Sequence, residues 1–425
     1  MQRLNYCISL LFFSFLLIGC SDSEPARQDP LPFEQAKSDM DRDTTPSVTS
    51  AQTQELVAGN TQFALDLYGA IADSEGGNLF YSPFSISIAL AMTYAGAENG
   101  TQTEMASIFH YTLPEPQLHQ AFNTLDLDLS SRGTGDASEF RLHLANALWG
   151  QTGYHFETPF LDTLALNYGS GLNLMDFITD PDGARVTIND WVEEQTEDRI
   201  QDLIPEGAIT SDTRLVLTNA IYFFGEWLNL FDSDNTAPGD FHKDDGSSVS
   251  VDMMHQALSL PSYQGVGYEA VALPYKGETV SLLVIAPDAG TMDTFEQTLD
   301  ATLLTSIVNA LQPTYLQLTM PKFTFEHRLP LKNLLMGMGL HAPFTPGVAD
   351  FSGVDGTTGL VITDILHKAF IAVNERGTEA AAATAVVEGI TSVPPVVTLD
   401  RPFLFMVRDN VTGTILFMGR LADPS

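Results

Sequence analysis

The residue types that perform most enzymatic chemistry are present in this 425-residue chain, but their spacing forms no recognisable site. The two cysteines are Cys7 and Cys20, and the nine histidines show no paired spacing that would hold a metal. No Gly-x-Ser-x-Gly, His-Glu-x-x-His, phosphate loop or Gly-x-Gly-x-x-Gly occurs. A pair of catalytic carboxylates stays open among 54 acidic residues, although each pair is better explained as solvated surface. We therefore expect no catalytic residue, no metal and no cofactor.

The charge of the chain is strongly one-sided. It has 54 acidic residues against 19 Lys and Arg, which gives a formal net charge of −35. Charged residues make up only 17% of the chain, so the imbalance reflects missing bases. Such a surface repels phosphate backbones, which excludes nucleic acid as a partner. The hydrophobic content of 44% and the 26 phenylalanines indicate a large packed core.

The first twenty residues have the pattern of a targeting segment. Arg3 precedes an apolar run, Cys7 to Ile18, that is too short to span a bilayer. The run ends in Leu-Ile-Gly-Cys20, which resembles a bacterial lipobox. That resemblance implies cleavage before Cys20 and lipidation of Cys20, with Ser21 pointing to the outer membrane. An ordinary secretion signal with an incidental cysteine is the alternative. With lipidation, the mature chain has no free thiol, which excludes cysteine catalysis.

Three segments follow from this pattern. Residues 1–19 are a lipoprotein signal peptide, and residues 20–52 are the lipidated cysteine and a flexible tether rich in Pro, Asp, Ser and Thr. Residues 53–425 show no internal repeat and no second linker, so we expect one domain. We expect a lipid-anchored location in the cell envelope, facing either the periplasm or the exterior.

The body of the chain mixes helix and strand patterns without regular alternation. Apolar spacing from Leu56 to Ile71 predicts a helix, and Ser82-Pro83 predicts the start of a second one. Further helices are expected within 293–311 and 329–338. Strands are expected at 141–149, 215–224, 280–286, 314–320, 361–374, 402–407 and 414–418. This mixture predicts an α+β fold with large sheets, at least one of them covered on both faces.

The segment from residue 374 to 395, NERGTEAAAATAVVEGITSVPP, is the most informative one. Its alanines favour helix, whereas Thr384, Val386 and Val387 favour strand. Every second residue from Thr378 to Val386 is small and uncharged, so one face could enter a sheet without burying a charge. From these residues alone, a surface loop with a frayed helix is the preferred interpretation.

Four motifs around this segment resemble the serpin family, and the resemblance covers about residues 53–425. They are residues 78–92 (NLFYSPFSISIALAM), 218–227 (TNAIYFFGEW), 367–383 (HKAFIAVNERGTEAAAA) and the closing pair 401–405 (RPFLF) and 415–420 (ILFMGR). The resemblance implies the serpin fold, an α+β domain of three β-sheets and eight or nine helices with an exposed reactive-centre loop.

The resemblance also implies a function that is not enzymatic. Serpins offer the loop as bait to serine endopeptidases, and in some cases to papain-like cysteine endopeptidases. Cleavage forms an acyl-enzyme, the loop inserts into the main sheet, and the attached protease is distorted before it deacylates. We expect a monomer whose partner is the target serine protease, in a 1:1 covalent complex. A non-inhibitory serpin that binds or stores another molecule is the alternative, and a secreted hydrolase is a third.

Individual residues acquire roles through the same comparison. The loop hinge comprises Glu375, Arg376, Gly377, Thr378, Glu379, Ala380, Ala381, Ala382 and Ala383. Within it, Gly377 would absorb the change in dihedral angles and Thr378 would be the first side chain buried on insertion. The scissile bond is expected between Thr391 and Ser392, with Ile390–Thr391 as the alternative. Glu388 would face the interior of the sheet late in insertion.

Two further groups match the family away from the loop. Ser82, Ser85, Asn219 and His367 match the shutter cluster, whose hydrogen bonds control the opening of the main sheet. Trp227 matches the breach, where the loop first enters. Phe224 stands where family members usually carry lysine, so its local contact stays undecided.

Missing bases limit the partners of the chain. No Lys or Arg occurs from Gly377 to Asp400, which argues against trypsin-like targets and favours elastase- or subtilisin-like ones. None occurs from Asp43 to Ser131 either, across the early helices where some serpins bind sulfated polysaccharide. We therefore expect no heparin-like cofactor.

Overall fold

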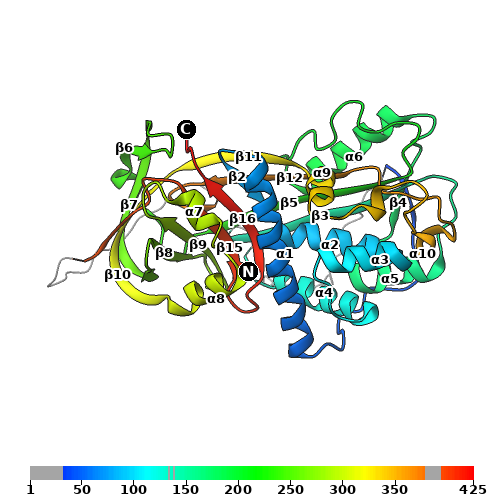
Figure 1. The fold of residues 1–425 in the computed structure, drawn as a ribbon, viewed down its shortest axis with the longest axis horizontal. Helices are drawn as coiled ribbons and strands as arrows, with labels where there is room; N and C mark the ends of the chain where they lie inside the picture. Colours follow the sequence, from blue (N-terminus) through cyan, green and yellow to red (C-terminus); the bar gives the residue numbers. More distant parts are fainter. Residues whose placement is uncertain (1–31, 133–134, 137–138, 379–393) are drawn as a thin grey trace, which may run out of the picture. The chain divides into compact units, whose positions relative to one another are not determined.

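The computed structural model describes residues 32–132, 135–136, 139–378 and 394–425, and Figure 1 shows how their helices and strands are arranged. The first helix, α1 (Ser50–Ser74), begins with a capping box formed by Thr49 and Gln52. The second, α2 (Pro83–Tyr94), begins at Ser82, whose side chain accepts a hydrogen bond from the Ser85 amide. Every residue of α2 is buried, so this helix lies in the core. Both helices confirm the sequence prediction.

The first sheet has seven strands in the order β1-β4-β3-β5-β13-β12-β11. Their bounds are β1 (Glu34–Ala36), β4 (Leu172–Met175), β3 (Phe140–Gln151), β5 (Leu215–Glu226), β13 (Gly377–Thr378), β12 (Ile365–Val373) and β11 (Phe323–Pro330). All twelve residues of β5 are buried, as expected for a central strand that is covered on both faces. β5 pairs antiparallel with β3 on one side and parallel with β12 on the other.

The second sheet forms one hydrogen-bonded path, β14-β10-β7-β8-β9-β15-β16-β2, with β6 paired to β7. The strands are β14 (Val396–Thr398), β10 (Gln312–Pro321), β7 (Ser248–Gln264), β8 (Tyr268–Pro274), β9 (Val280–Pro287), β15 (Phe403–Asp409), β16 (Ile415–Leu421), β2 (Leu79–Tyr81) and β6 (Ala237–His242). Three sheets were expected from the resemblance, but the described residues form two. The reason is β7, which pairs with β6 and β10 and then continues far enough to pair with β8.

The remaining helices cover the sheets. They are α3 (Asn99–Ile108), α4 (Glu115–Ser130), α5 (Thr158–Tyr168), α6 (Pro181–Gln195), α7 (Met292–Glu296), α8 (Ala301–Ala310), α9 (Leu331–Gly337) and α10 (Ser352–Asp355). The described ranges thus contain ten α-helices where eight or nine were expected, and α7 and α10 have only five and four residues. The helix predicted over 293–311 is two helices, because Asp300 caps a new start at α8.

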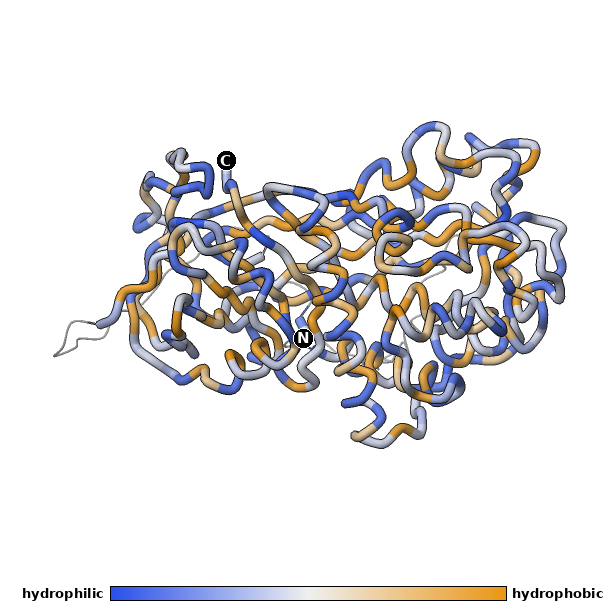
Figure 2. Tube along the Cα trace, in the orientation of Figure 1, coloured by the Kyte–Doolittle hydropathy of each residue, from blue (hydrophilic) through white to orange (hydrophobic). Residues whose placement is uncertain are grey.

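Hydrophobic and hydrophilic residues separate along this fold. Figure 2 shows hydrophobic residues running along the interior strands, while hydrophilic residues are frequent in the loops at the rim. Within the described ranges, no helix is both long and apolar enough to cross a bilayer.

The prediction of a flexible tether up to residue 52 is wrong for its second part. The compact unit begins at Phe33 rather than at residue 53. β1 extends the first sheet by pairing with β4, and the Phe33 ring packs edge-on against Trp149, with 4.9 Å between ring centroids. Further along, the Arg42 guanidinium lies 2.6 Å from the Asp126 carboxylate. We call residues 33–43 the strap. Composition alone did not show that its few apolar and charged residues have partners on the body.

Candidate functional site

The turn between β12 and β13 is bonded tightly to the end of β5. The Asn374 amide donates to the Gly377 carbonyl over 2.9 Å, which closes the turn. The Trp227 amide donates to the Arg376 carbonyl over 2.7 Å, and the Phe231 amide donates to the Glu375 carbonyl over 2.8 Å. The predicted hinge residues 375–377 therefore lie against the residues that follow β5.

The last of these hinge residues and the residue after it already belong to the sheet. Gly377 and Thr378 form β13, which pairs with the end of β5 and, through Thr378, with Val373 of β12. The Thr378 side chain is buried, and its hydroxyl lies 2.7 Å from the hydroxyl of Tyr275. Thr378 was expected to become buried only on insertion. The structure buries Thr378 before any insertion, because its side chain is small and uncharged and its hydroxyl has a hydrogen-bond partner in Tyr275.

Gly377 is required by a close approach of two backbones. A Cβ atom at this position would lie 2.0 Å from the carbonyl oxygen of Gly225. Any side chain here would therefore push β13 away from β5. The sequence comparison assigned Gly377 to a change in dihedral angles, whereas the structure shows a packing reason for glycine as well.

Four charged side chains form a network beside the hinge. The buried Glu226 carboxylate accepts hydrogen bonds from Arg376 and from Lys276. Lys276 also lies 2.6 Å from Glu139, and its hydrogen bonds to Glu139 and Glu226 raise the pKa of its ammonium group. The two acids and two bases balance, so the buried charge of Glu226 is compensated. The sequence prediction did not include Glu226, although an acid at the end of an apolar strand signals a partner.

Glu375 is held on the other side of the hinge. Its carboxylate lies 3.1 Å from the Lys322 ammonium and accepts a hydrogen bond from the Thr236 hydroxyl over 2.9 Å. Burial alone would raise the pKa of Glu375, but its own amide, Thr236 and Lys322 together hold this pKa below the ordinary value. Glu375 therefore stays ionised near neutral pH and contributes to holding the hinge.

Trp227 lies directly beneath the turn. Its indole stacks on the Tyr275 ring, with 4.7 Å between centroids, and its Nε1 donates to the Asn374 carbonyl over 3.0 Å. Tyr275 thus contacts both Trp227 and Thr378, and it was missed because its neighbours come from distant parts of the chain. At the predicted Phe224 position, the Arg141 guanidinium lies 4.5 Å from the ring centroid.

The four predicted shutter residues meet in one hydrogen-bonded cluster at the centre of the fold. The Ser82 amide donates to His367 Nε2 over 3.2 Å, and His367 Nδ1 bonds the side-chain oxygen of Asn219. The Asn219 amide group donates to the Ser85 hydroxyl over 2.8 Å. Asn146 of β3 also joins, since its oxygen accepts from Ser85 and Asn219. The cluster therefore links α2 to β3, β5 and β12.

These bonds define the proton position on His367. Nε2 must be the acceptor for the Ser82 amide, so the hydrogen of the neutral ring is on Nδ1 and points to Asn219. Complete burial, together with the charge of nearby His327, lowers the pKa of His367 to about 3. His367 is therefore neutral at physiological pH. Asn146 was missed, although a single amide among apolar strand residues indicates a buried hydrogen bond.

Some predicted residues lie outside the described part of the structure. They are Cys20, Glu379, Ala380, Ala381, Ala382, Ala383, Glu388, Ile390, Thr391 and Ser392. The two ends of the loop, at Thr378 and at residue 394, are described.

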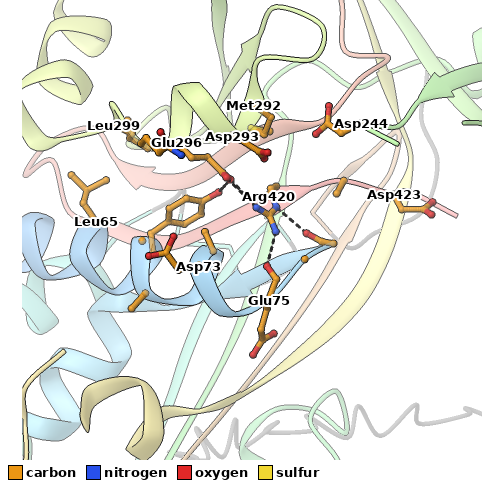
Figure 3. A pocket seen from close by; sticks show the side chains of 18 of the residues that line it. Leu65, Asp73, Glu75, Asp244, Met292, Asp293, Glu296, Leu299, Arg420 and Asp423 are labelled. Atoms are coloured by element: carbon orange, nitrogen blue, oxygen red, sulfur yellow. Dashed lines mark hydrogen bonds and ion pairs between the residues drawn. The ribbon is translucent and has the colours of Figure 1, made fainter. Parts of the chain in front are cut away.

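A cavity of about 1120 Å³ lies elsewhere, between α1, α7 and β16. Figure 3 shows Arg420 of the closing motif reaching across it. The Arg420 guanidinium donates to the Glu75 and Gly77 carbonyls and to both oxygens of Glu296. Arg420 therefore ties β16 to α1 and α7. Among the described residues, no group of three or more His, Cys, Asp or Glu is placed to hold a metal ion.

Both groups of contacts lie along the pairing of β5 with β12. Below β13, β5 and β12 pair directly through residues 217–221 and 365–369. The hinge network lies at one end of this seam, and the His367 cluster lies along it. The bonds of His367 to Ser82 and Asn219 therefore cross the seam between β12 and β5.

Comparison with known proteins identifies a common family. The serpin (serine protease inhibitor) family model matches residues 58–424. An uncharacterized serpin-like protein of Methanosarcina acetivorans is 34% identical, and the match covers 98% of each chain. The leukocyte elastase inhibitor of Homo sapiens is 36% identical over 87% of this chain and 100% of the relative. The structure of human thyroxine-binding globulin matches with a TM-score of 0.80 and 29% identity, over 88% of this chain and 100% of that one.

Proposed function

Because this chain belongs to the serpin family, we propose that it is a single-use inhibitor of serine endopeptidases that traps them by loop insertion. The observation that supports this proposal best is β13. Gly377 and Thr378 occupy a strand position between β5 and β12, so the path of an inserting loop has its first two residues in place.

The seam below β13 provides room for a complete strand once it opens. β5 and β12 are paired to each other there through five residues on each strand. An inserted strand would bond to both, so the lost pairing would be replaced by two new ladders. About 14 inserted residues at roughly 3.3 Å each form a strand of about 45 Å. β5, with its 12 residues, has a comparable length.

Insertion after cleavage converts a substrate into a trap. The protease forms an acyl-enzyme with the new carboxyl end of the loop, and insertion pulls this end along the sheet. Distortion of the protease's oxyanion hole then slows deacylation by orders of magnitude. The intact inhibitor is kinetically trapped, since its more stable inserted form is reached only after the cut.

The proposed targets are elastase-like or subtilisin-like enzymes. The loop and the residues that follow it, from Gly377 to Asp400, contain no Lys or Arg for a trypsin-like pocket. The similarity to a leukocyte elastase inhibitor agrees with this choice. The proposed scissile bond is Thr391–Ser392, where a small β-branched residue precedes the cut.

The proposed location is the cell envelope. Cys20 would carry a lipid anchor after removal of residues 1–19, and the domain would act on proteases that reach that membrane. The pattern Leu-Ile-Gly-Cys20 supports this part of the proposal.

Incubation with elastase, subtilisin and trypsin tests the inhibitory function. We expect a complex with elastase or subtilisin that survives denaturing electrophoresis, and none with trypsin. Mass measurement of the released peptide locates the cut. Cleaved chain without any complex would favour the non-inhibitory alternative, for which thyroxine-binding globulin is a structural precedent.

A further inference from the structure

The strap joins the domain at the end of the first sheet that lies farthest from the hinge. Along β3, Phe140 pairs with Gly225, which neighbours the hinge, and Trp149 pairs with Val216. Phe33 packs against Trp149. Nine residues of β3 separate these two levels, which corresponds to roughly 30 Å along the strand. In Figure 1, β4, which pairs with the strap, lies at the right, and β10, which pairs with β14 after the loop, lies at the left.

The strap is attached at several independent points. Its β1 residues pair with β4, and the Gln35 amide donates to the Asn173 side chain over 2.7 Å. The Ser38 hydroxyl bonds Asp162 of α5 over 2.5 Å, and Arg42 bonds Asn123 and Asp126 of α4. Bonds to a sheet edge and to two helices hold the entry point of the chain in one place.

Fixing the strap shortens the chain between the proposed anchor and the domain. Cys20 and residue 53 are 33 residues apart, a separation that allows about 110 Å of extended chain. Cys20 and Phe33 are only 13 residues apart, which allows at most about 45 Å. The end of the sheet at Trp149 is therefore kept within about 45 Å of any membrane that holds Cys20.

We propose that this end of the domain, marked by Phe33 and Trp149, is the membrane-facing surface, so that the trapping mechanism proposed above would carry a protease to the membrane side. The inference rests on the proposed function, both the trapping mechanism and the anchor at Cys20. The hinge lies at the opposite end of the same strands, so the loop is offered to proteases on the side away from the membrane.

The register of β13 predicts where the trapped protease comes to rest. Thr378 pairs with Gly225, and β13 runs antiparallel to β5. Continuing that pairing places residue 387 opposite Val216, at the level of Trp149 and Phe33. The proposed acylated residue, Thr391, is four residues further, or roughly 13 Å beyond this level. The protease would therefore lie between the strap end of the domain and the membrane.

The distance between the strap end of the domain and the membrane then limits the size of the target protease. A single-domain protease of about 230 residues has a diameter of roughly 45 Å, from the usual relation of size to chain length. The span from Cys20 to Phe33 just accommodates it. The natural partner is therefore a small, soluble, single-domain protease rather than a large multidomain one.

Shortening the span while keeping the anchor tests this proposal. Residues 20–425 contain one thiol, Cys20, which can be coupled to a maleimide lipid in phosphatidylcholine vesicles, so the test does not depend on natural lipidation. A variant lacking residues 24–31 keeps the whole strap but spans only about 17 Å. Both lengths are prepared anchored and unanchored, and single-domain elastase is added to all four. Loop cleavage and covalent complex are measured separately.

We expect the anchored short variant to be cleaved at an unchanged rate but to lose covalent complex by about tenfold or more, since geometry forbids the final position. The other three forms should give equal amounts of complex. Equal complex from the anchored short variant would overturn the proposal, as would slower cleavage of its loop, which would indicate that the loop faces the membrane. An anchored full-length form that fails while its unanchored form inhibits would also overturn it. Absence of complex in all four would instead reject the inhibitory function, and the inference with it.

Discussion

The hydroxyl of Thr378, a residue of β13, lies 2.7 Å from the hydroxyl of Tyr275, which follows β8. The first loop residue that an inhibitory serpin would insert is thus already bonded to the core. The proposed insertion would therefore continue a strand that exists and would not start a new one. The contacts around this pair determine how readily the strand lengthens.

Replacing Thr378 by a large charged residue should convert the inhibitor into a substrate. In Thr378→Arg, the guanidinium would be buried without a partner beside Tyr275, so β13 would be displaced and insertion delayed. We expect about tenfold less covalent complex with elastase, because deacylation then overtakes insertion. Denaturing electrophoresis gives the ratio of complex to cleaved chain. Thr378→Ser keeps the hydroxyl and should behave as the wild type, and an Arg variant that inhibits equally well would contradict the assigned path.

Cleavage of the loop should raise the melting temperature sharply. The cut frees the loop to pair with both β5 and β12, whose facing edges are paired to each other along residues 217–221 and 365–369 before cleavage. Calorimetry of the intact and cleaved protein measures the difference. The Thr378→Arg variant is the control, and its melting temperature should rise less on cleavage. Superimposable melting curves for intact and cleaved wild type would argue against insertion.

Removing the charge of Glu226 should loosen the hinge. Glu226→Gln leaves Arg376 and Lys276 without their shared carboxylate, and both are partly exposed, so we expect a loss of roughly 2 kcal/mol in unfolding free energy. Denaturant unfolding measures it. The matched variant Glu206→Gln changes an exposed acid and should alter stability by less than about 0.5 kcal/mol. Equal changes in unfolding free energy for the two variants would show that the charged network does not stabilise the protein.

His367 should make stability depend on pH in the acid range. Its pKa is near 3 in the folded protein and about 6.5 when unfolded, so only the unfolded chain takes up a proton between these values. Stability from this site is complete above pH 6.5 and is lost as the pH falls towards 3, by about 1.4 kcal/mol per pH unit. Denaturant unfolding at several pH values, compared with His367→Gln, isolates the contribution. Parallel pH profiles for the two proteins would contradict it.

The strap should contribute to stability although it was expected to be a tether. Phe33→Ala removes a half-buried ring from Trp149, and we expect a loss of about 1–2 kcal/mol. Met40→Ala changes a residue of the same segment whose side chain is half exposed, and it should be close to neutral. Thermal unfolding of both variants gives the comparison. If Phe33→Ala left the thermal stability unchanged, the strap would not be bound to the domain in solution.

Several features of this protein were predictable from its sequence because they depend on near neighbours. The start of α1 at Thr49 and of α2 at Ser82 follow from capping residues and apolar spacing within a few positions. The strands β5 and β12 follow from runs rich in apolar and β-branched residues. The serpin family itself follows from motifs in a fixed order, and the family comparison confirms it.

Other features depended on which distant segments become neighbours. Glu226, Lys276 and Arg376 come from three separate parts of the chain. The pairing of β13 with β5 brings Arg376 to Glu226, and the antiparallel bridge between Trp227 and Tyr275 brings Lys276 there. Asn146 joins His367's cluster because β3 pairs with β5 at the register that places it opposite Asn219.

By itself, the sequence determined α1, α2 and α9, the strands β3, β5, β9, β10, β12, β15 and β16, the family and a loop whose small uncharged residues suit insertion. Only the tertiary structure decided that Thr378 is already in the sheet, that the chain enters the fold at Phe33, and which groups hold the hinge. The physical reason is that local conformational preferences are properties of short segments. Register and long-range ion pairs depend on the packing of segments that are far apart in the sequence.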